Sequence, residues 1–183
     1  MQIKSLLLAP LVASGLVTAT PSPSKPYRFE ALALRSATDI HFAVVQAAHS
    51  SIFLKLPQQK ATCEKKTDNS ATFSIVNGEL FLYGKTRQQI YVDRSGMGQG
   101  KIGYTTGTQS APRNAERKGW AIDKDGDLSF KGKNLVACPH SIDGAWSVWV
   151  STGIKTPGGN KGCLEFLPRT AEIKKPISCK YTQ

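Results

Sequence analysis

The sequence predicts an all-β fold, with a β-trefoil preferred and a β-sandwich as the alternative. The first observation is the stretch 73–84, in which apolar and polar residues alternate on either side of Asn77-Gly78. An Asn-Gly pair between alternating segments is the strongest short-range signal for a β-hairpin. The second is that residues 120–132 repeat this layout 47 residues later, and each hairpin is followed by another pair of strand-like segments. The two units therefore resemble copies of one internal repeat.

The number of repeats decides between the two architectures. The second strand pairs are 90–92 with 102–104, and 135–137 with 146–150. A third copy, with a poorer match, is expected to begin at Phe29. Three four-stranded units would form a trefoil, whereas two units with additional strands would suit a sandwich.

Two segments precede the expected domain. Residues 1–19 combine a short basic start, a small apolar run and small residues at the end, which is typical of a secretory signal peptide. Residues 20–28 are rich in Pro and Ser and are expected to form an extended linker. We expect residues 29–183 to form a single all-β domain outside the cell. No later stretch approaches about 18 apolar residues, so a membrane span is not expected.

The first part of the domain is less regular than the rest. Residues 29–42 alternate loosely and predict a strand, while residues 43–56 fit either a short helix or an irregular strand. Residues 57–70 are polar and charged and predict a loop that carries Cys63.

Four cysteines in a secreted chain predict two disulfides, for which three connectivities are possible. The tentative assignment joins Cys163 to Cys179 across a short loop and leaves Cys63 with Cys138. The spacings match neither paired zinc ligands nor a redox motif, so no metal site is predicted.

The stretch 90–107 contains a glycine-rich loop between two strands. Residues 98–103 match the G-x-G-x-x-G pattern, but the following residues are rich in Thr, Gly and Pro and do not predict the helix that a dinucleotide site requires. No cofactor is therefore expected. Gly96, Gly98, Gly100 and Gly103 are instead expected to be structural, at least one of them with positive φ.

No catalytic residue is selected by the pattern of titratable side chains. A secreted basic ribonuclease would need an acid and a base, for which His49, His140 and Glu79 beside Arg94 are the candidates, yet no spacing selects a pair. Residues 123–127, Asp-Lys-Asp-Gly-Asp, resemble part of a calcium loop, but the glycine falls at the wrong position. A hairpin turn is the better interpretation, and the chain is expected not to be an enzyme.

The chain is basic, with a formal charge of +11 that falls to +10 when Lys4 is removed with the signal peptide. Lys and Arg are scattered, so a solvated surface is the default interpretation. The alternative is an anionic partner, such as phosphorylated mannan or acidic polysaccharide. Nucleic acid ranks last because aromatic residues, which stack on bases, make up only 8% of the chain.

Several motifs resemble the fungal cell wall protein PhiA family. The central one is VDRSGMGQGKIGYTTG at residues 92–107, and the others lie at residues 119–123, 135–139, 144–149 and 179–183. The resemblance covers nearly the whole mature chain. It implies a small, secreted, non-enzymatic cell wall protein of filamentous fungi, linked with phialide and conidium formation and with protection against stress. The basic charge, with pairs at Lys65-Lys66 and Lys174-Lys175, departs from what the family leads us to expect.

Two other functions remain open beside the one that the resemblance implies. A secreted, lectin-like carbohydrate-binding module is compatible with a trefoil, since fold alone does not fix function. A protease inhibitor or antimicrobial effector is compatible with a small, basic, disulfide-bonded scaffold. The expected partners are cell wall polysaccharides or other wall components, while the oligomeric state is left open.

One strand carries the candidate binding residues. In residues 145–151, side chains alternate between faces, so Trp146, Val148 and Val150 are expected to face the core. Ser147, Trp149 and Ser151 then face outward. Trp149 either packs under a neighbouring loop at residues 155–162 or presents its ring to a sugar, with Ser147 and Ser151 as hydrogen-bond partners and Lys155 nearby for an anionic group.

Overall fold

The computed structural model describes residues 27–183, so the predicted signal peptide (1–19) and nearly all of the linker (20–28) lie outside the described residues. The described chain is built of strands joined by turns, which confirms the all-β prediction. No helix within residues 27–183 is long and apolar enough to cross a membrane. The strands are β1 (Arg28–Leu34), β2 (Val45–Ala48), β3 (Ser51–Leu54), β4 (Thr62–Cys63), β5 (Phe73–Val76), β6 (Glu79–Leu82), β7 (Gln88–Asp93), β8 (Lys101–Thr106), β9 (Ala115–Glu116), β10 (Trp120–Ile122), β11 (Leu128–Phe130), β12 (Leu135–Cys138), β13 (Trp146–Val150), β14 (Leu164–Glu172) and β15 (Cys179–Lys180).

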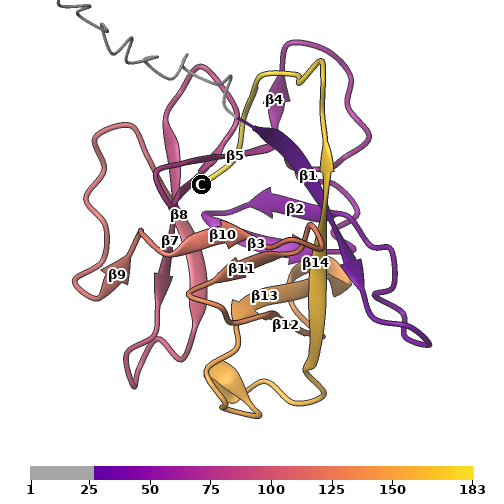
Figure 1. Ribbon diagram of the computed structural model, residues 1–183, viewed down its shortest axis with the longest axis vertical. Helices are drawn as coiled ribbons and strands as arrows, with labels where there is room; N and C mark the ends of the chain where they lie inside the picture. Colours follow the sequence, from indigo (N-terminus) through magenta and orange to yellow (C-terminus); the bar gives the residue numbers. More distant parts are fainter. Residues whose placement is uncertain (1–26) are drawn as a thin grey trace, which may run out of the picture.

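Nine strands pair side by side into a closed antiparallel ring (Figure 1). Around the ring the order is β3-β13-β12-β14-β1-β5-β6-β7-β8, and β8 pairs with β3 to close it. The seam between β1 and β14 places Phe29 opposite Glu172 and Leu34 opposite Leu167, and the β7–β8 seam is equally long. Neither the trefoil nor the sandwich is confirmed, because one continuous sheet closes on itself to form a barrel.

Three of the predicted strand pairs, β5–β6, β7–β8 and β12–β13, are present in the ring. Strands β5 and β6 flank Asn77 and Gly78, whose φ values of 51° and 76° are both positive, as a type I′ turn requires. Strand pairs β7–β8 and β12–β13 also match the predicted segments. However, β10 and β11 form their own two-stranded sheet beside the ring, so the two predicted repeat copies are not structurally equivalent.

The ambiguous segment 43–56 is a β-hairpin rather than a helix. Strands β2 and β3 pair from Val45 opposite Leu54 to Ala48 opposite Ser51. The turn residues His49 and Ser50 have φ values of 47° and 54°, an uncommon conformation for residues other than glycine. The absence of Asn or Gly at this turn explains why the sequence did not distinguish a hairpin.

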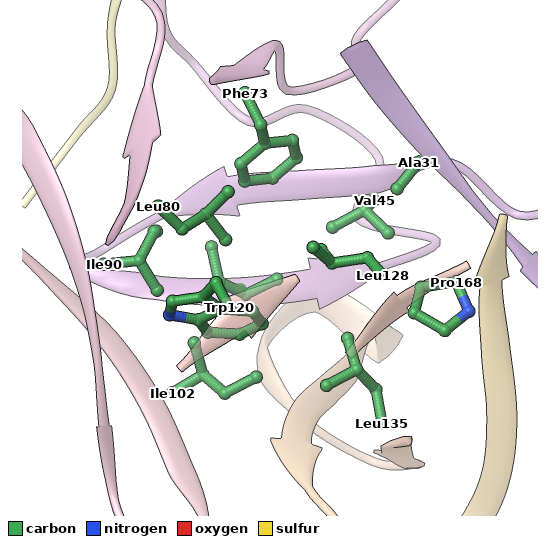
Figure 2. Close-up of a pocket in the computed structure, with 11 residues that line it drawn as sticks. Ala31, Val45, Phe73, Leu80, Ile90, Ile102, Trp120, Leu128, Leu135 and Pro168 are labelled. Atoms are coloured by element: carbon green, nitrogen blue, oxygen red, sulfur yellow. The ribbon is translucent and has the colours of Figure 1, made fainter. Parts of the chain in front are cut away.

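Apolar side chains fill the barrel interior (Figure 2). The cavity that remains between them has a volume of only about 20 Å³ and is lined entirely by apolar residues and Pro168. That space suits about one water molecule and offers it no polar partner. The interior is therefore a packed core and not a container for a ligand, so any binding surface lies on the outside.

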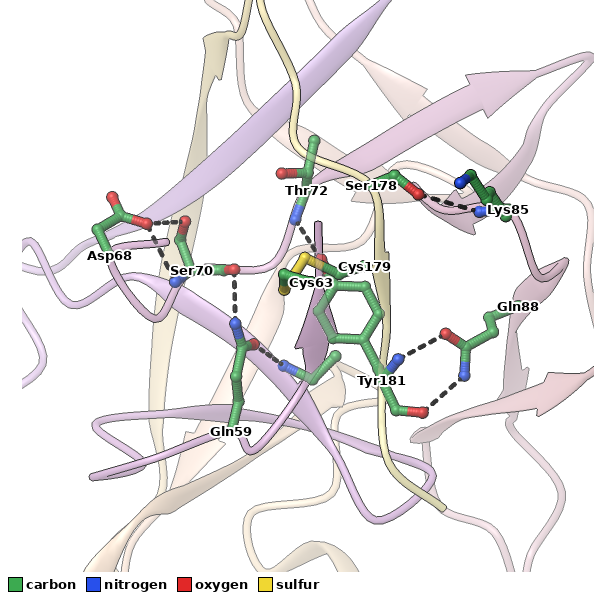
Figure 3. Close-up of a disulfide and its surroundings, with 11 residues drawn as sticks. Gln59, Cys63, Asp68, Ser70, Thr72, Lys85, Gln88, Ser178, Cys179 and Tyr181 are labelled. Carbon is green, nitrogen blue, oxygen red and sulfur yellow. Dashed lines mark hydrogen bonds between the residues drawn. A yellow bond between two sulfur atoms is a disulfide. The ribbon is translucent and has the colours of Figure 1, made fainter. Parts of the chain in front are cut away.

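Both disulfides form, but with a connectivity that differs from the tentative assignment. Cys63 pairs with Cys179, and Cys138 pairs with Cys163. Strands β4 and β15 place Cys63 directly opposite Cys179 (Figure 3). The pairing of β12 with β14 brings the other two cysteines together. Cys163 and Cys179 are close in sequence, but strand β14 runs between them and spans about 30 Å for its nine residues.

Candidate functional site

Strand β13 alternates between the core and the surface as the sequence predicts. Val148 and Val150 are buried in the barrel, and half-buried Trp146 packs against the same core. Ser147 and Trp149 point to the outer face and are half-buried. The outer face of β13 is therefore the part of the barrel that carries the predicted binding residues.

Trp149 is held in place by contacts on two sides. Its indole Nε1 donates a hydrogen bond of 3.0 Å to the hydroxyl of Ser147. Its ring edge lies under Gly158, where an added Cβ would come within 2.8 Å of Cη2. Gly158 belongs to the 3-10 turn η2 (Pro157–Gly159), so Trp149 packs under the loop that the sequence suggested.

The glycine-rich loop secures the cover over Trp149. The side chain of Gln99 accepts a hydrogen bond of 2.8 Å from the backbone N–H of Gly158. Its backbone carbonyl accepts another of 3.3 Å from Thr152. In the same loop, Gly100 has a φ of 96° and an added Cβ would lie 2.1 Å from the carbonyl oxygen of Val150. The prediction that a glycine here has positive φ is confirmed, and the loop packs against β13 and the residues that follow it.

Trp149 is not fully covered, because it also lines a surface depression of about 250 Å³. Lys101 is its register partner on β8, which puts the ammonium group on the same face as the indole. Ser147 and His49 contribute further polar groups, and Ile142 contributes an exposed apolar side chain. The depression thus combines one aromatic surface with hydrogen-bond donors and acceptors. It is slightly smaller than typical ligand pockets.

Ser151 belongs to a different depression from Trp149 and Ser147. This polar cleft has a volume of about 570 Å³, and its lining residues are Arg94, Ser95, Glu116, Lys133, Ser151, Thr152 and Gly153. The Ser151 hydroxyl lies 3.4 Å from a carboxylate oxygen of Glu165 rather than beside the indole. The structure therefore brings Ser147 and Trp149 together in one depression. The third predicted contact residue, Ser151, lies just beyond the end of β13 and lines the polar cleft instead.

An ion-pair network forms one wall of the polar cleft. Arg94 donates two hydrogen bonds to Glu116, of 2.7 and 2.8 Å, and Lys131 donates a third of 2.5 Å. These contacts lower the pKa of Glu116 to about 2, and the hydrogen bonds from Arg94 have the largest effect. The carboxylate is ionised and saturated with donors, so it is poorly suited to act as a general base.

Comparison with known proteins identifies the family. The family model of PhiA-like secreted proteins matches residues 29–182. The chain belongs to the PhiA-like family. The cell wall protein phiA of Aspergillus fumigatus is 50% identical to this chain over 186 residues and is covered completely, as is the chain. The protein of the same name from Emericella nidulans is 51% identical over 173 residues, covering 93% of this chain and 95% of its own.

A more distant relative extends the same result. The cell wall protein phiA of Arthroderma benhamiae is 41% identical over 191 residues, with both chains covered completely. No solved structure matches the chain. The PhiA-like chain is thus a secreted protein of the cell wall, and its residues 27–183 fold into the barrel described above.

The histidines of the PhiA-like chain do not assemble with acids. His41 accepts a backbone hydrogen bond from Arg35, and its ring contacts that of Phe42 at a tilted angle. His49 and His140 are exposed turn residues with positive φ. Within residues 27–183 no histidine side chain is hydrogen-bonded to a carboxylate, and Arg94 is engaged by Glu116 rather than by the other ribonuclease candidates.

The acidic turn of the PhiA-like chain is a hairpin turn. Asp123 accepts hydrogen bonds of 2.9 Å from the backbone N–H groups of Asp127 and Asp125, and these bonds, the one from Asp127 most of all, lower its pKa. Asp127 is bound by Arg169 at 2.6 Å. Among the described residues, no group of three His, Cys, Asp or Glu is placed to hold a metal ion.

Sequence reasoning missed several residues of the PhiA-like site. Lys101 and His49 reach Trp149 only through the pairing of β3 and β8 with β13, which no local pattern encodes. Apart from its position in the glycine-rich loop, nothing in the sequence indicates that Gln99 binds the loop over Trp149. Gly158, by contrast, lies within the loop that the sequence proposed as a cover.

Proposed function

We propose that this PhiA-like chain is a non-enzymatic protein of the fungal cell wall that supports phialide and conidium formation and protects against stress. The family membership and the relatives named as cell wall proteins support this proposal. We further propose that residues 1–19 are removed as a signal peptide and that residues 29–183 form a single domain. In this role the protein acts by attachment to wall polysaccharide.

The observation that carries the attachment proposal is the depression at Trp149. An indole ring offers a flat apolar surface of the kind on which the C–H face of a sugar ring can pack. The Ser147 hydroxyl accepts the indole N–H, so its own O–H remains able to donate to a sugar hydroxyl. Lys101 supplies additional donors from the neighbouring strand. A lectin-like function would use the same surface.

Replacing the indole tests this proposal directly. Trp149→Ala should remain folded and show reduced retention on isolated fungal cell walls, whereas Trp149→Phe, which keeps an aromatic face, should retain most of it. Phe42→Ala is a matched control because Phe42 is 64% exposed and does not line the depression. Thermal unfolding of each variant separates a binding effect from a loss of fold. Equal retention of wild type and a folded Trp149→Ala would reject the indole as the anchor.

The developmental role needs a test in the organism. A strain that lacks this protein would be complemented with the wild type, with Trp149→Ala or with Phe42→Ala, and its phialides and conidia counted. Full rescue by a Trp149→Ala protein that no longer stays in the wall would separate development from attachment. Failure of the wild type to change conidiation or stress survival would reject the developmental part of the proposal.

A further inference from the structure

The short ribbon of β4 and β15 lies at one end of the barrel, near the top of Figure 1, whereas β13 lies in the lower half. Cys63 and Cys179 join its two strands, and Lys180 lies opposite Thr62 in register. The connection from β14 to β15, residues 173–178, passes beside β4. We call this region, made of residues 57–70 and 173–183 with Lys85, the basic end.

Two depressions lie in the surface of the basic end. The first has a volume of about 300 Å³ and lies in the loop before and after β4, where Lys60 and Lys66 line it. The second, about 260 Å³, is lined by Lys85 and Lys180, and by Glu64 as its one acidic side chain. Hydroxyl or amide groups line both of them: Gln58, Gln59, Thr67 and Asn69 in the first, and Thr62, Thr86 and Ser178 in the second.

The charges of the basic end are unbalanced. Residues 57–70 and 173–183 contain six lysines and two acidic side chains, Glu64 and Asp68. Glu64 is paired with Lys85 at 2.8 Å, and Asp68 accepts a hydrogen bond of 2.5 Å from the Ser70 hydroxyl. Within the part of the chain that the structure describes, none of the six lysines forms an ion pair. Their positive charge is therefore available to a partner.

The basic end is also rigid. The disulfide joins the two strands of the ribbon to each other. The ribbon is also attached to the barrel, because the N–H of Cys179 donates a hydrogen bond of 3.2 Å to the carbonyl of Tyr83. The Ser178 hydroxyl accepts the backbone N–H of Lys85 at 3.2 Å, as Figure 3 shows. The N–H of Glu64 donates to the carbonyl of Ser178 at 3.0 Å. A rigid backbone lowers the entropy cost of binding, although the lysine side chains themselves stay mobile.

We propose that the basic end binds polysaccharide that carries oxyanions, either phosphodiesters or uronate carboxylates. Each ammonium group carries a positive charge and donates hydrogen bonds, so a surface of lysines attracts an anionic chain more strongly than a neutral one. None of the side chains that line the two depressions is aromatic, which disfavours the stacking that single-stranded nucleic acid needs. Because the Trp149 depression lies on another part of the barrel, one molecule can hold a neutral and an anionic polymer together.

The test compares two sets of four lysine substitutions in the otherwise intact protein. The basic-end variant is Lys60→Gln, Lys66→Gln, Lys85→Gln and Lys180→Gln. The control variant is Lys118→Gln, Lys124→Gln, Lys133→Gln and Lys161→Gln, which removes the same charge elsewhere. Each set breaks one exposed ion pair, Lys85–Glu64 or Lys124–Asp125, so the two are matched in that respect too. The probes are polygalacturonate, phosphorylated mannan, the same mannan after dephosphorylation, and single-stranded RNA.

Wild type should bind at least one anionic polysaccharide at physiological ionic strength, and the basic-end substitutions should leave any binding to dephosphorylated mannan unchanged. The basic-end variant should bind about tenfold more weakly, with a shallower salt dependence, and the control variant less than about twofold more weakly. Binding to phosphorylated mannan alone or to polygalacturonate alone would support the proposal and identify the oxyanion. Equal losses in the two variants, tighter binding to RNA, or no binding to either polymer would overturn it. A folded Trp149→Ala should bind these probes like wild type, so this proposal and the wall-attachment proposal can fail separately.

Discussion

The side chain of Gln88 pairs with the backbone of Tyr181 as a strand would. Its Nε2 donates to the Tyr181 carbonyl at 2.9 Å, and its Oε1 accepts from the Tyr181 N–H at 2.8 Å (Figure 3). Both residues are buried, and the Tyr181 hydroxyl accepts the N–H of Thr72 at 3.0 Å. The last residues of the chain are thereby built into the barrel, although they lie beyond its final strand.

Removing this amide should destabilise the protein. Gln88→Leu leaves the N–H and carbonyl of Tyr181 buried without their partner, which should lower the free energy of unfolding by about 2 to 4 kcal/mol. Gln58→Leu, at an exposed position, should change it by less than about 0.5 kcal/mol. Urea unfolding followed by tryptophan fluorescence measures both. A Gln88→Leu protein as stable as the control would show that the tail is not held by this pair.

The two disulfides should contribute unequally. Cys63–Cys179 spans 116 residues and Cys138–Cys163 spans 25, so chain entropy predicts about 5 and about 3.5 kcal/mol, respectively. The double Ser variant of the first pair should therefore lose about 1.5 kcal/mol more than that of the second. Denaturant unfolding of both variants checks the order. In a non-reducing digest, a peptide that links Cys63 to Cys138 would contradict the connectivity itself.

Glycines in the glycine-rich loop should differ sharply in their tolerance of alanine. Gly100→Ala forces a Cβ against the carbonyl of Val150 at a φ of 96° and should cost about 2 kcal/mol or more. Gly96→Ala meets nothing within 4 Å and should be nearly neutral. Thermal unfolding should give a clearly lower melting temperature for Gly100→Ala than for Gly96→Ala. Similar melting temperatures would mean that the loop relaxes more freely than its contacts indicate.

The pKa of Glu116 predicts a loss of stability in acid. Because its pKa is lowered from 4.5 to about 2 on folding, its contribution is present above pH 4.5 and is lost as the pH falls toward 2. Allowing for its partial exposure, wild type should lose about 1 to 2 kcal/mol more than Glu116→Gln over this range. Asp125→Asn, which removes only an exposed pair with Lys124, serves as control. Unfolding curves at pH 5 and pH 2.5 measure the difference, and parallel losses in wild type and Glu116→Gln would refute it.

Local patterns predicted the parts of the fold that neighbouring residues determine. The Asn77-Gly78 turn has the backbone angles that its residues favour, and the alternation of β13 correctly assigned Val148 and Val150 to the core. The suggestion that a loop near residue 158 covers Trp149 also followed from proximity along the chain. In each case the decisive interactions lie within about ten residues.

Long-range pairing could not be predicted in the same way. Phe29 meets Glu172, and Cys63 meets Cys179, across more than 100 residues, and neither pairing leaves a mark in local sequence. The His49-Ser50 turn has positive φ values without glycine, so its hairpin gave no signal. For the same reason Lys101 could not be assigned to the Trp149 depression, because strand register alone puts them together.

Closure of the ring determines how this protein can meet its neighbours in a crowded wall. An open sheet exposes a row of N–H and C=O groups that can recruit another strand and lead to aggregation. Here each of the nine strands in the ring is hydrogen-bonded to a neighbour on both sides, and the described strands outside it are only two to four residues long. Contacts with polymers or with other copies must then be made by side chains. We therefore expect the protein to be released from walls by salt or competing sugar, under conditions that leave it folded.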